Sequence, residues 1–217
     1  MTPFLPYLAI AGVAVPVGGS LLLERTYRTD PWLRSLPVPD VTMTTHAVAT
    51  ACAVLLMICA VSLGLSPVAA AILGPLFGIA LLTDCAGRVL PDLLTATIAL
   101  VGLALALLGR GLPLPVALAG MIGSLLVFWL FRCAMIARHG PNGFALGDVK
   151  FLTASAAFLP IDRIAWAIML GCFLGLAVLS WRKVRPALDP TLPFGSLFVG
   201  GFGLLTLAAP ILPGFRA

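Results

Sequence analysis

Apolar residues form long runs along the chain, and short polar stretches that hold most of the charged residues separate them. A helix needs about 20 apolar residues to cross a bilayer, because the hydrocarbon core is about 30 Å thick. At that length per span, the pattern predicts an all-α, polytopic membrane protein with about eight transmembrane helices. The runs cover approximately residues 3–23, 44–63, 67–83, 93–109, 114–134, 146–160, 163–181 and 193–212. The run at 146–160 is short, so we expect a half-length or tilted element there.

Composition supports the same prediction. Hydrophobic residues make up 61% of the 217 residues, charged residues make up 10%, and the mean hydropathy is +1.13. A soluble domain carries about 25% charged residues, so this chain lacks the polar surface that water requires. The connections leave no room for a separate soluble domain. We therefore predict a single transmembrane domain over 1–217, in which 1–43 forms the first helix and a short cytoplasmic loop.

The net charge of +5 does not indicate nucleic acid as a partner, because the basic residues lie in gaps between apolar runs rather than on one polar face. This distribution is typical of the positive-inside rule. Alternate connections carry ten of the 13 basic residues, which predicts that these connections are cytoplasmic in a multi-pass protein of a bacterial inner membrane. The ten are Arg25, Arg28, Arg34, Arg88, Arg132, Arg138, Lys150, Arg182, Lys183 and Arg185.

Acidic residues are rare, eight in all, and two of them lie at the edges of strongly apolar runs. Asp84 ends GIALLTDC, and Asp148 opens GDVKFLTASAAF. A carboxylate at such a depth is costly to bury and indicates function. Both fall on the predicted cytoplasmic edge, so they can be neighbours. Two carboxyls that share a partly desolvated site hold one proton between them, so one can activate water while the other polarises a peptide carbonyl.

Spacing alone leaves other interpretations open for these two residues. Asp84 can pair with Arg88 at a helical spacing of four residues. Asp148 can pair with Lys150 or cap a helix. A proton-coupled transporter would use the same kind of carboxylate.

Three segments together carry a resemblance to a known family. They read DCAGRVLPDLLT from Asp84, ALGDVKFLTA around Asp148, and LPFGSLFVGGFGLL near the C-terminus. In this order they resemble the type IV prepilin peptidase family, which consists of membrane aspartic proteases of the GxGD type. The resemblance covers about residues 67–205, which we expect to form the peptidase core.

The resemblance implies a role for individual residues. Asp84 and Asp148 match the two catalytic aspartates of the family. Gly147 matches the glycine before the second aspartate, where a missing side chain permits close backbone approach. Lys150 matches a lysine that we expect to tune the two carboxyls or to hold the substrate near the lipid headgroups.

A further group matches the P-D-x-L-T element of the family, namely Pro91, Asp92 and Thr95. We expect Asp92 to cap a helix rather than to catalyse, because a carboxylate is favourable at a helix start. Two positions depart from the family pattern. Ala145 replaces the first glycine of GxGD, and Ser196 stands at the second proline position of the C-terminal segment.

The chain resembles a short form of the family. Many members carry a cytoplasmic insert with paired CxxC motifs and also N-methylate the mature substrate, whereas loop 24–43 is short and contains no cysteine. We therefore expect methylation to be absent or performed elsewhere. The five cysteines form no CxxC pair, so we expect no metal, and we expect no cofactor.

The resemblance implies an endopeptidase that removes the leader from type IV prepilins or type II secretion pseudopilins. The expected partners are the precursor's apolar helix and the lipid bilayer. Two alternatives stay open: a proton-coupled small transporter, and a catalytically silent assembly protein of a pilus or secretion system.

Overall fold

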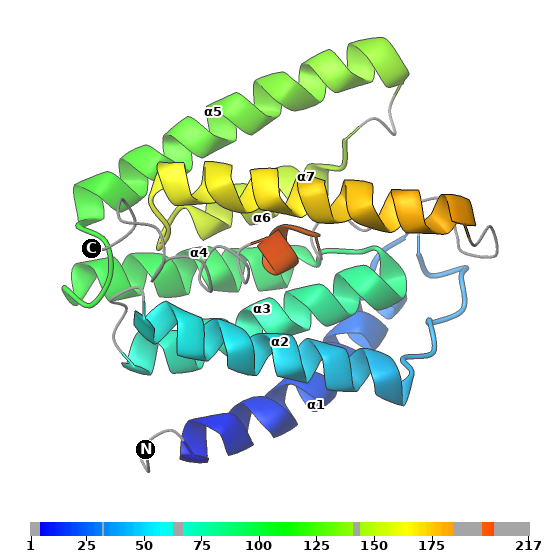
Figure 1. The fold of residues 1–217 in the computed structure, drawn as a ribbon, viewed down its shortest axis with the longest axis horizontal. Helices are drawn as coiled ribbons and strands as arrows, with labels where there is room; N and C mark the ends of the chain where they lie inside the picture. The colour runs from blue at the N-terminus through cyan, green and yellow to red at the C-terminus, as the bar shows by residue number, and fades with distance from the viewer. Residues whose placement is uncertain (1–4, 32, 63–66, 141–143, 185–196, 202–217) are drawn as a thin grey trace. The chain divides into compact units, whose positions relative to one another are not determined.

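The computed structural model describes residues 5–31, 33–62, 67–140, 144–184 and 197–201 (Figure 1). The described part of the chain is all-helical, as predicted. Its helices are α1 (Leu5–Thr29), α2 (Met43–Ser62), α3 (Pro67–Gly87), α4 (Asp92–Leu107), α5 (Leu114–His139), α6 (Leu146–Ser155) and α7 (Ile161–Val184), followed by a helical turn at 197–201. The short element expected at 146–160 is present as the ten-residue helix α6.

Helices α1 and α5 extend beyond the apolar runs that predicted them. Helix α1 continues to Thr29, and a 2.5 Å ion pair between Glu24 and Arg28 lies on this polar extension. Loop 24–43 is therefore shorter than predicted. Helix α5 likewise continues to His139 instead of ending near 134. Apolar runs mark the part of a helix that needs an apolar surrounding, and the backbone hydrogen bonds continue past it. Most of the predicted run at 193–212 lies outside the described residues.

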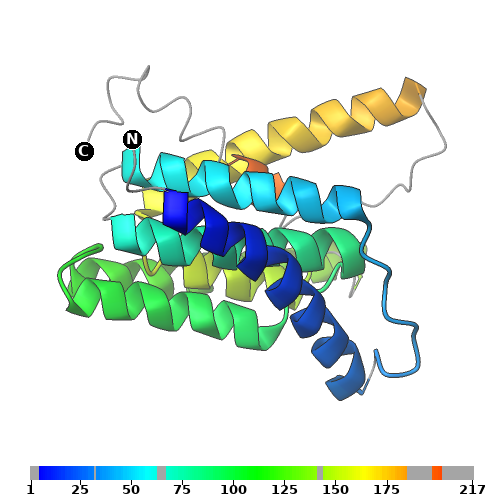
Figure 2. The same ribbon diagram turned by 90° about the horizontal axis from the view of Figure 1, so that it is seen from below.

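The contacts divide the chain into two compact units. The first comprises residues 1–88 and 165–217, and the second comprises residues 89–164. In the first unit, α1, α2 and α3 pack against one another (Figure 2). Small residues allow α2 and α3 to approach closely. A Cβ atom added at Gly78 would lie 2.7 Å from Ala53 Cβ, and one added at Gly74 would lie 2.9 Å from the Ala53 carbonyl oxygen.

A hydrogen bond also joins α1 to α2. Ser20 Oγ lies 3.0 Å from Nε2 of His46, and Nδ1 of the same ring lies 3.1 Å from the Thr42 carbonyl oxygen. The first helical turn of α2 is capped by Thr42, whose Oγ1 accepts the Thr45 N–H at 3.2 Å. These contacts fix the start of α2 against α1.

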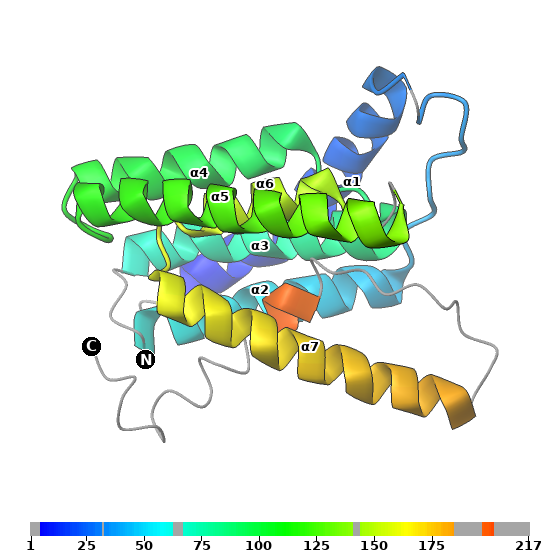
Figure 3. The ribbon, with the colours of Figure 1, turned by 90° about the horizontal axis from the view of Figure 1, so that it is seen from above.

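In the second unit, α6 packs against both α4 and α5 (Figure 3). Its side chains Val149, Phe151 and Leu152 are fully buried. Close packing continues just beyond the helix, where a Cβ atom at Gly102 of α4 would lie 2.5 Å from Ala157 Cβ. The short α6 is therefore a buried element that its neighbours hold on two sides.

Two of the described helices, α3 and α5, are long and apolar enough to cross a membrane. Helix α3 is mostly buried within the protein, whereas α5 exposes most of its apolar side chains, including Ile122, Leu126 and Leu130. A continuous apolar helix face of this length is unstable in water and stable in lipid. The exposed face of α5 thus supports the membrane prediction independently of composition.

Candidate active site

Asp84 lies inside the last turn of α3, not at the end of the helix, and it is only 5% exposed. The Arg88 N–H donates to the Asp84 carbonyl oxygen at 3.0 Å, and Arg88 itself has a left-handed φ of 52°. Helix α1 packs against this end of α3, because a Cβ atom at Gly87 would lie 2.8 Å from Leu23 Cδ1. Asp84 is therefore held in a rigid, packed turn.

Asp148 is the third residue of α6 and is 8% exposed. The N-cap position belongs to Ala145, so Asp148 is not the helix cap that was one alternative. The partial positive charge at a helix N-terminus favours a carboxylate in this first turn. Asp148 is therefore a buried acidic residue in the first turn of α6.

Lys150 and Asp92 form a two-pronged ion pair within the second unit. Nζ of Lys150 lies 2.7 Å from Oδ1 and 2.8 Å from Oδ2 of Asp92. Pro91 is the N-cap of α4 and Asp92 is its first helical residue, so Asp92 lies in the first turn, where a carboxylate is favourable, without being the N-cap itself. Its carboxylate binds the lysine of the GDVK segment instead.

Pro91 and Thr95 build the turn that presents Asp92. Pro91 is the N-cap of α4, and its carbonyl oxygen accepts the Thr95 N–H at 3.2 Å. The Thr95 hydroxyl donates to the Asp92 carbonyl oxygen at 3.0 Å and is buried. The PDLLT segment is therefore a helix start that holds a carboxylate toward Lys150.

The close approach expected at Gly147 is present. A Cβ atom there would lie 3.3 Å from Leu90 Cβ, which is tighter than an ordinary contact. Gly147 and Lys150 flank Asp148, and both contact the chain at the start of α4. Two contacts therefore fix the turn of α6 that carries Asp148.

Two contacts from α5 were missed in the sequence. The Arg132 guanidinium donates through Nη1 to the Phe144 carbonyl oxygen. The Phe131 ring meets the Phe144 ring edge to face, with centroids 5.2 Å apart. Both contacts hold the chain two residues before α6 begins. The sequence contains one signal for these contacts, because Arg132 is a lone charge inside the apolar run 114–134. From the sequence alone, it was counted only among the basic residues that predict the cytoplasmic side.

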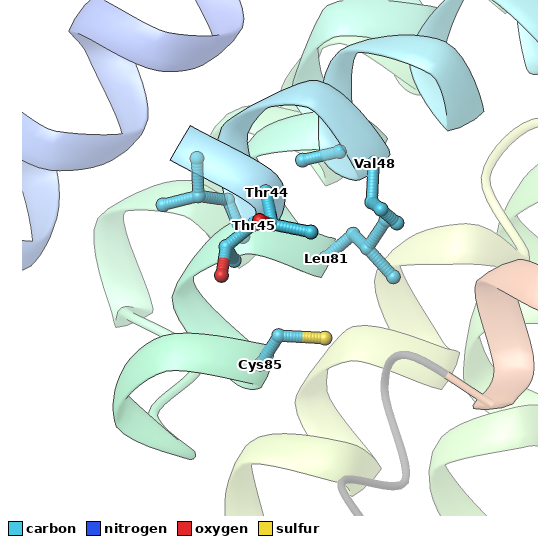
Figure 4. A pocket seen from close by; sticks show the side chains of 7 residues that line it. Thr44, Thr45, Val48, Leu81 and Cys85 are labelled. Atoms are coloured by element: carbon cyan, nitrogen blue, oxygen red, sulfur yellow. The ribbon is translucent and has the colours of Figure 1, made fainter. Parts of the chain in front are cut away.

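A pocket between α2 and α3 was also missed. It has a volume of about 190 Å³ and lies at the start of α2 and the end of α3 (Figure 4). Its lining residues are Thr44, Thr45, Val48, Ala49, Leu81, Leu82 and Cys85. Cys85, which directly follows Asp84 in the sequence, is one of these lining residues.

Within the described residues, no three His, Cys, Asp or Glu side chains lie close enough together to hold a metal ion. Asp84 belongs to the first unit, whereas Asp148 and the other expected site residues belong to the second. The pairing of the two carboxyls stays a prediction. The P-F-G-S element with Ser196 lies outside the described residues.

Comparisons with known proteins agree with these features. The family model described as Type IV leader peptidase family matches residues 71–180, which include every expected site residue. A prepilin leader peptidase/N-methyltransferase of Burkholderia pseudomallei (strain K96243) is 31% identical over 125 residues, covering 56% of this chain and 40% of that protein. The protein of the same name from Dickeya chrysanthemi is 29% identical over 126 residues, covering 56% of this chain and 44% of that protein.

A third relative of that name, from Pectobacterium carotovorum subsp. carotovorum, is 30% identical over 132 residues, covering 56% of this chain and 47% of that protein. The chain thus spans less than half the length of these curated relatives. No solved structure matches the chain significantly. Because the family model covers half of the chain and both buried aspartates, the chain belongs to the type IV leader peptidase family.

Proposed function

We propose that the protein is an inner-membrane aspartic endopeptidase that removes the leader from type IV prepilins or pseudopilins, with Asp84 and Asp148 as its catalytic pair. One observation carries the proposal. Among the described acidic residues, only these two are buried, and both lie within the residues that match the family. Burial of a carboxylate is costly, so two such residues in so apolar a chain indicate function.

The proposed reaction needs one proton shared by the two carboxyls. The ionised carboxylate removes a proton from water, and the protonated one donates to the oxygen of the scissile carbonyl. The tetrahedral intermediate then collapses: the carboxylate that protonated the carbonyl oxygen takes that proton back, the C–N bond breaks, and the other carboxyl gives its proton to the departing amine. Water is the nucleophile throughout, so no covalent bond to the protein forms.

The proposed substrate is a precursor with a short basic leader and an apolar helix. The helix would lie in the bilayer beside the enzyme and leave its cleavage site at the cytoplasmic edge. The excess of basic residues in the connections next to Asp84 and Asp148 supports this side. The names of the relatives also include N-methyltransferase, but loop 24–43 lacks cysteine, so methylation is not part of the proposal.

The first test is cleavage of a purified precursor by the purified protein in detergent. Asp84→Asn and Asp148→Asn should each lower kcat by about 10²-fold to 10⁴-fold, because each removes an acid–base group. Asp162→Asn is the matched control, since Asp162 is an exposed carboxylate in the first turn of α7. It should cleave at the wild-type rate.

Cleavage that persists in both Asn variants would rule out the catalytic pair. If the wild type cleaves no precursor of its own host, the result would favour the two alternative functions, a proton-coupled transporter and a catalytically silent assembly protein. Proton-coupled flux into proteoliposomes that Asp84→Asn abolishes would then identify a transporter. An assembly protein would support pilus formation with both aspartates replaced.

A further inference from the structure

Two consecutive residues of α5 contact the same residue just before α6. The Arg132 guanidinium donates through Nη1 to the Phe144 carbonyl oxygen, and the Phe131 ring packs edge to face on the Phe144 ring at an interplanar angle of 85°. One contact holds the backbone of Phe144, and the other holds its side chain. We call Phe131, Arg132 and Phe144 the α5 clamp. All three residues lie in the second unit together with α6.

The α5 clamp holds the chain where α6 lacks a cap of its own. Phe144 directly precedes Ala145, the N-cap of α6, and Asp148 follows four residues after Phe144. An alanine side chain cannot accept an N–H, and α6 has no side-chain cap hydrogen bond within the described residues. A helix of ten residues is also too short to be stable alone. The start of α6 therefore depends on its neighbours, and the α5 clamp holds it from the N-terminal side.

The cost of a charge at Arg132 indicates that its contact matters. The residue is half-buried, and its neighbours Leu130 and Phe131 are exposed and apolar. A cation in an apolar span is costly, and such residues pair with opposite charges or with backbone carbonyl oxygens. Arg132 has the second kind of partner, and a hydrogen bond from a charged donor is about twice as strong as a neutral one. The bond to Phe144 is thus the role that the structure gives to this charge.

Two contacts from the start of α4 hold the same part of α6 from another side. A Cβ atom at Gly147 would lie 3.3 Å from Leu90 Cβ, and Lys150 binds Asp92. Gly147 and Lys150 flank Asp148, whereas the α5 clamp lies before it. General acid–base catalysis needs a carboxyl within hydrogen-bond reach of the group with which it exchanges a proton, so a small displacement of α6 would matter.

We propose that Arg132 is a positioning residue: through the Phe144 carbonyl oxygen it holds the first turn of α6, and with it the Asp148 carboxyl, in the place that cleavage requires. The inference rests on the proposed function. Phe131 supports the same contact through the Phe144 ring. The competing role is a direct effect of the Arg132 charge on the two carboxyls, which would not depend on the bond to Phe144.

The first test measures kcat for each precursor-binding site, counted with a precursor whose scissile amide is reduced and cannot be cleaved. This count removes any contribution of misfolded protein. Arg132→Met should lower kcat by up to about 10²-fold with little change in KM, because a displacement of about 1 Å at a catalytic group has an effect of that size. Arg132→Lys keeps a donor for the carbonyl oxygen and should recover most of kcat. Phe131→Leu leaves the charge in place and should lower kcat by a smaller factor.

Arg138→Met is the matched control, because it makes the same substitution at an exposed arginine in the last turn of α5. It should cleave at the wild-type rate. Arg132→Met should also keep the pH dependence of the wild type. A shifted pH profile in Arg132→Met with full activity in Phe131→Leu would show that the charge acts directly and would overturn the positioning role. Arg132→Lys as impaired as Arg132→Met would overturn it as well.

Hydrogen–deuterium exchange separates this inference from the proposed function, because it needs no cleavage. The amides of residues 149–152 bond to carbonyl oxygens at the start of α6, so they report on that turn. They should exchange severalfold faster in Arg132→Met and at the wild-type rate in Arg138→Met. Unchanged exchange in Arg132→Met, or faster exchange with wild-type kcat, would overturn the positioning role. A wild type that cleaves no precursor would instead overturn the proposed function.

Discussion

Lys150 binds both carboxylate oxygens of Asp92 although 58 residues separate them in the sequence. From the sequence, each residue was assigned a role close to its own position in the chain. Lys150 was a candidate partner of Asp148, and Asp92 was expected to cap a helix. Sequence spacing favours such local partners, because it contains no information on which helices pack together. The two motif segments could therefore be recognised from the sequence, but the bond between them could not.

This pair predicts a positioning role for Lys150. Its side chain is 38% exposed and that of Asp92 is 76% exposed, so the pair should contribute only about 0–1 kcal/mol to the free energy of unfolding. Its larger effect should be on cleavage, because a displacement of about 1 Å at a catalytic group costs up to about 10²-fold. Lys150→Met and Asp92→Asn should each lower kcat at least several-fold with little change in Tm.

The charge swap Asp92→Lys with Lys150→Glu should recover part of the lost kcat. Arg28→Met is the control, because it removes an exposed ion pair with Glu24 in the other unit. A swap no better than the single variants would show that Lys150 acts through its own charge and not through Asp92.

At the scale of helices, the sequence predicted the number and order of the described elements well and their ends less well. The polar ends of α1 and α5 run past the apolar runs, and Asp84 lies within α3 for the same reason. Hydropathy reports where a helix needs lipid, whereas helix ends depend on backbone hydrogen bonds. The pocket between α2 and α3 could not be predicted from the sequence either, because it depends on which faces of the two helices meet.

The contact between α2 and α3 predicts which glycines are structural. Gly78→Ala should lower Tm by several degrees, because overpacking costs about 1–3 kcal/mol and the new Cβ atom would lie 2.7 Å from Ala53 Cβ. Gly12→Ala in α1 is the matched control, since nothing lies within 4 Å of its added Cβ atom. Thermal unfolding in one detergent compares the two, and equal Tm values would contradict tight packing at Gly78.

At the scale of the whole molecule, basic residues predict the orientation in the membrane. In a cysteine-free background, Arg34→Cys and Arg138→Cys should react with an impermeant maleimide only after spheroplasts are lysed. Arg110→Cys and Arg163→Cys should react in intact spheroplasts. Labelling of Arg138→Cys in intact cells would place the chain before Asp148 outside and contradict a cytoplasmic active site.

The exposed face of α5 has a consequence for every measurement on this protein. Side chains such as Ile122, Leu126 and Leu130 need an apolar surrounding that the described chain does not supply. Lipid or detergent is therefore a bound component of the native state, and its affinity for that state adds to the stability of the fold. Two variants can be ranked only in the same amphiphile at the same concentration, because each Tm belongs to the protein and its amphiphile together.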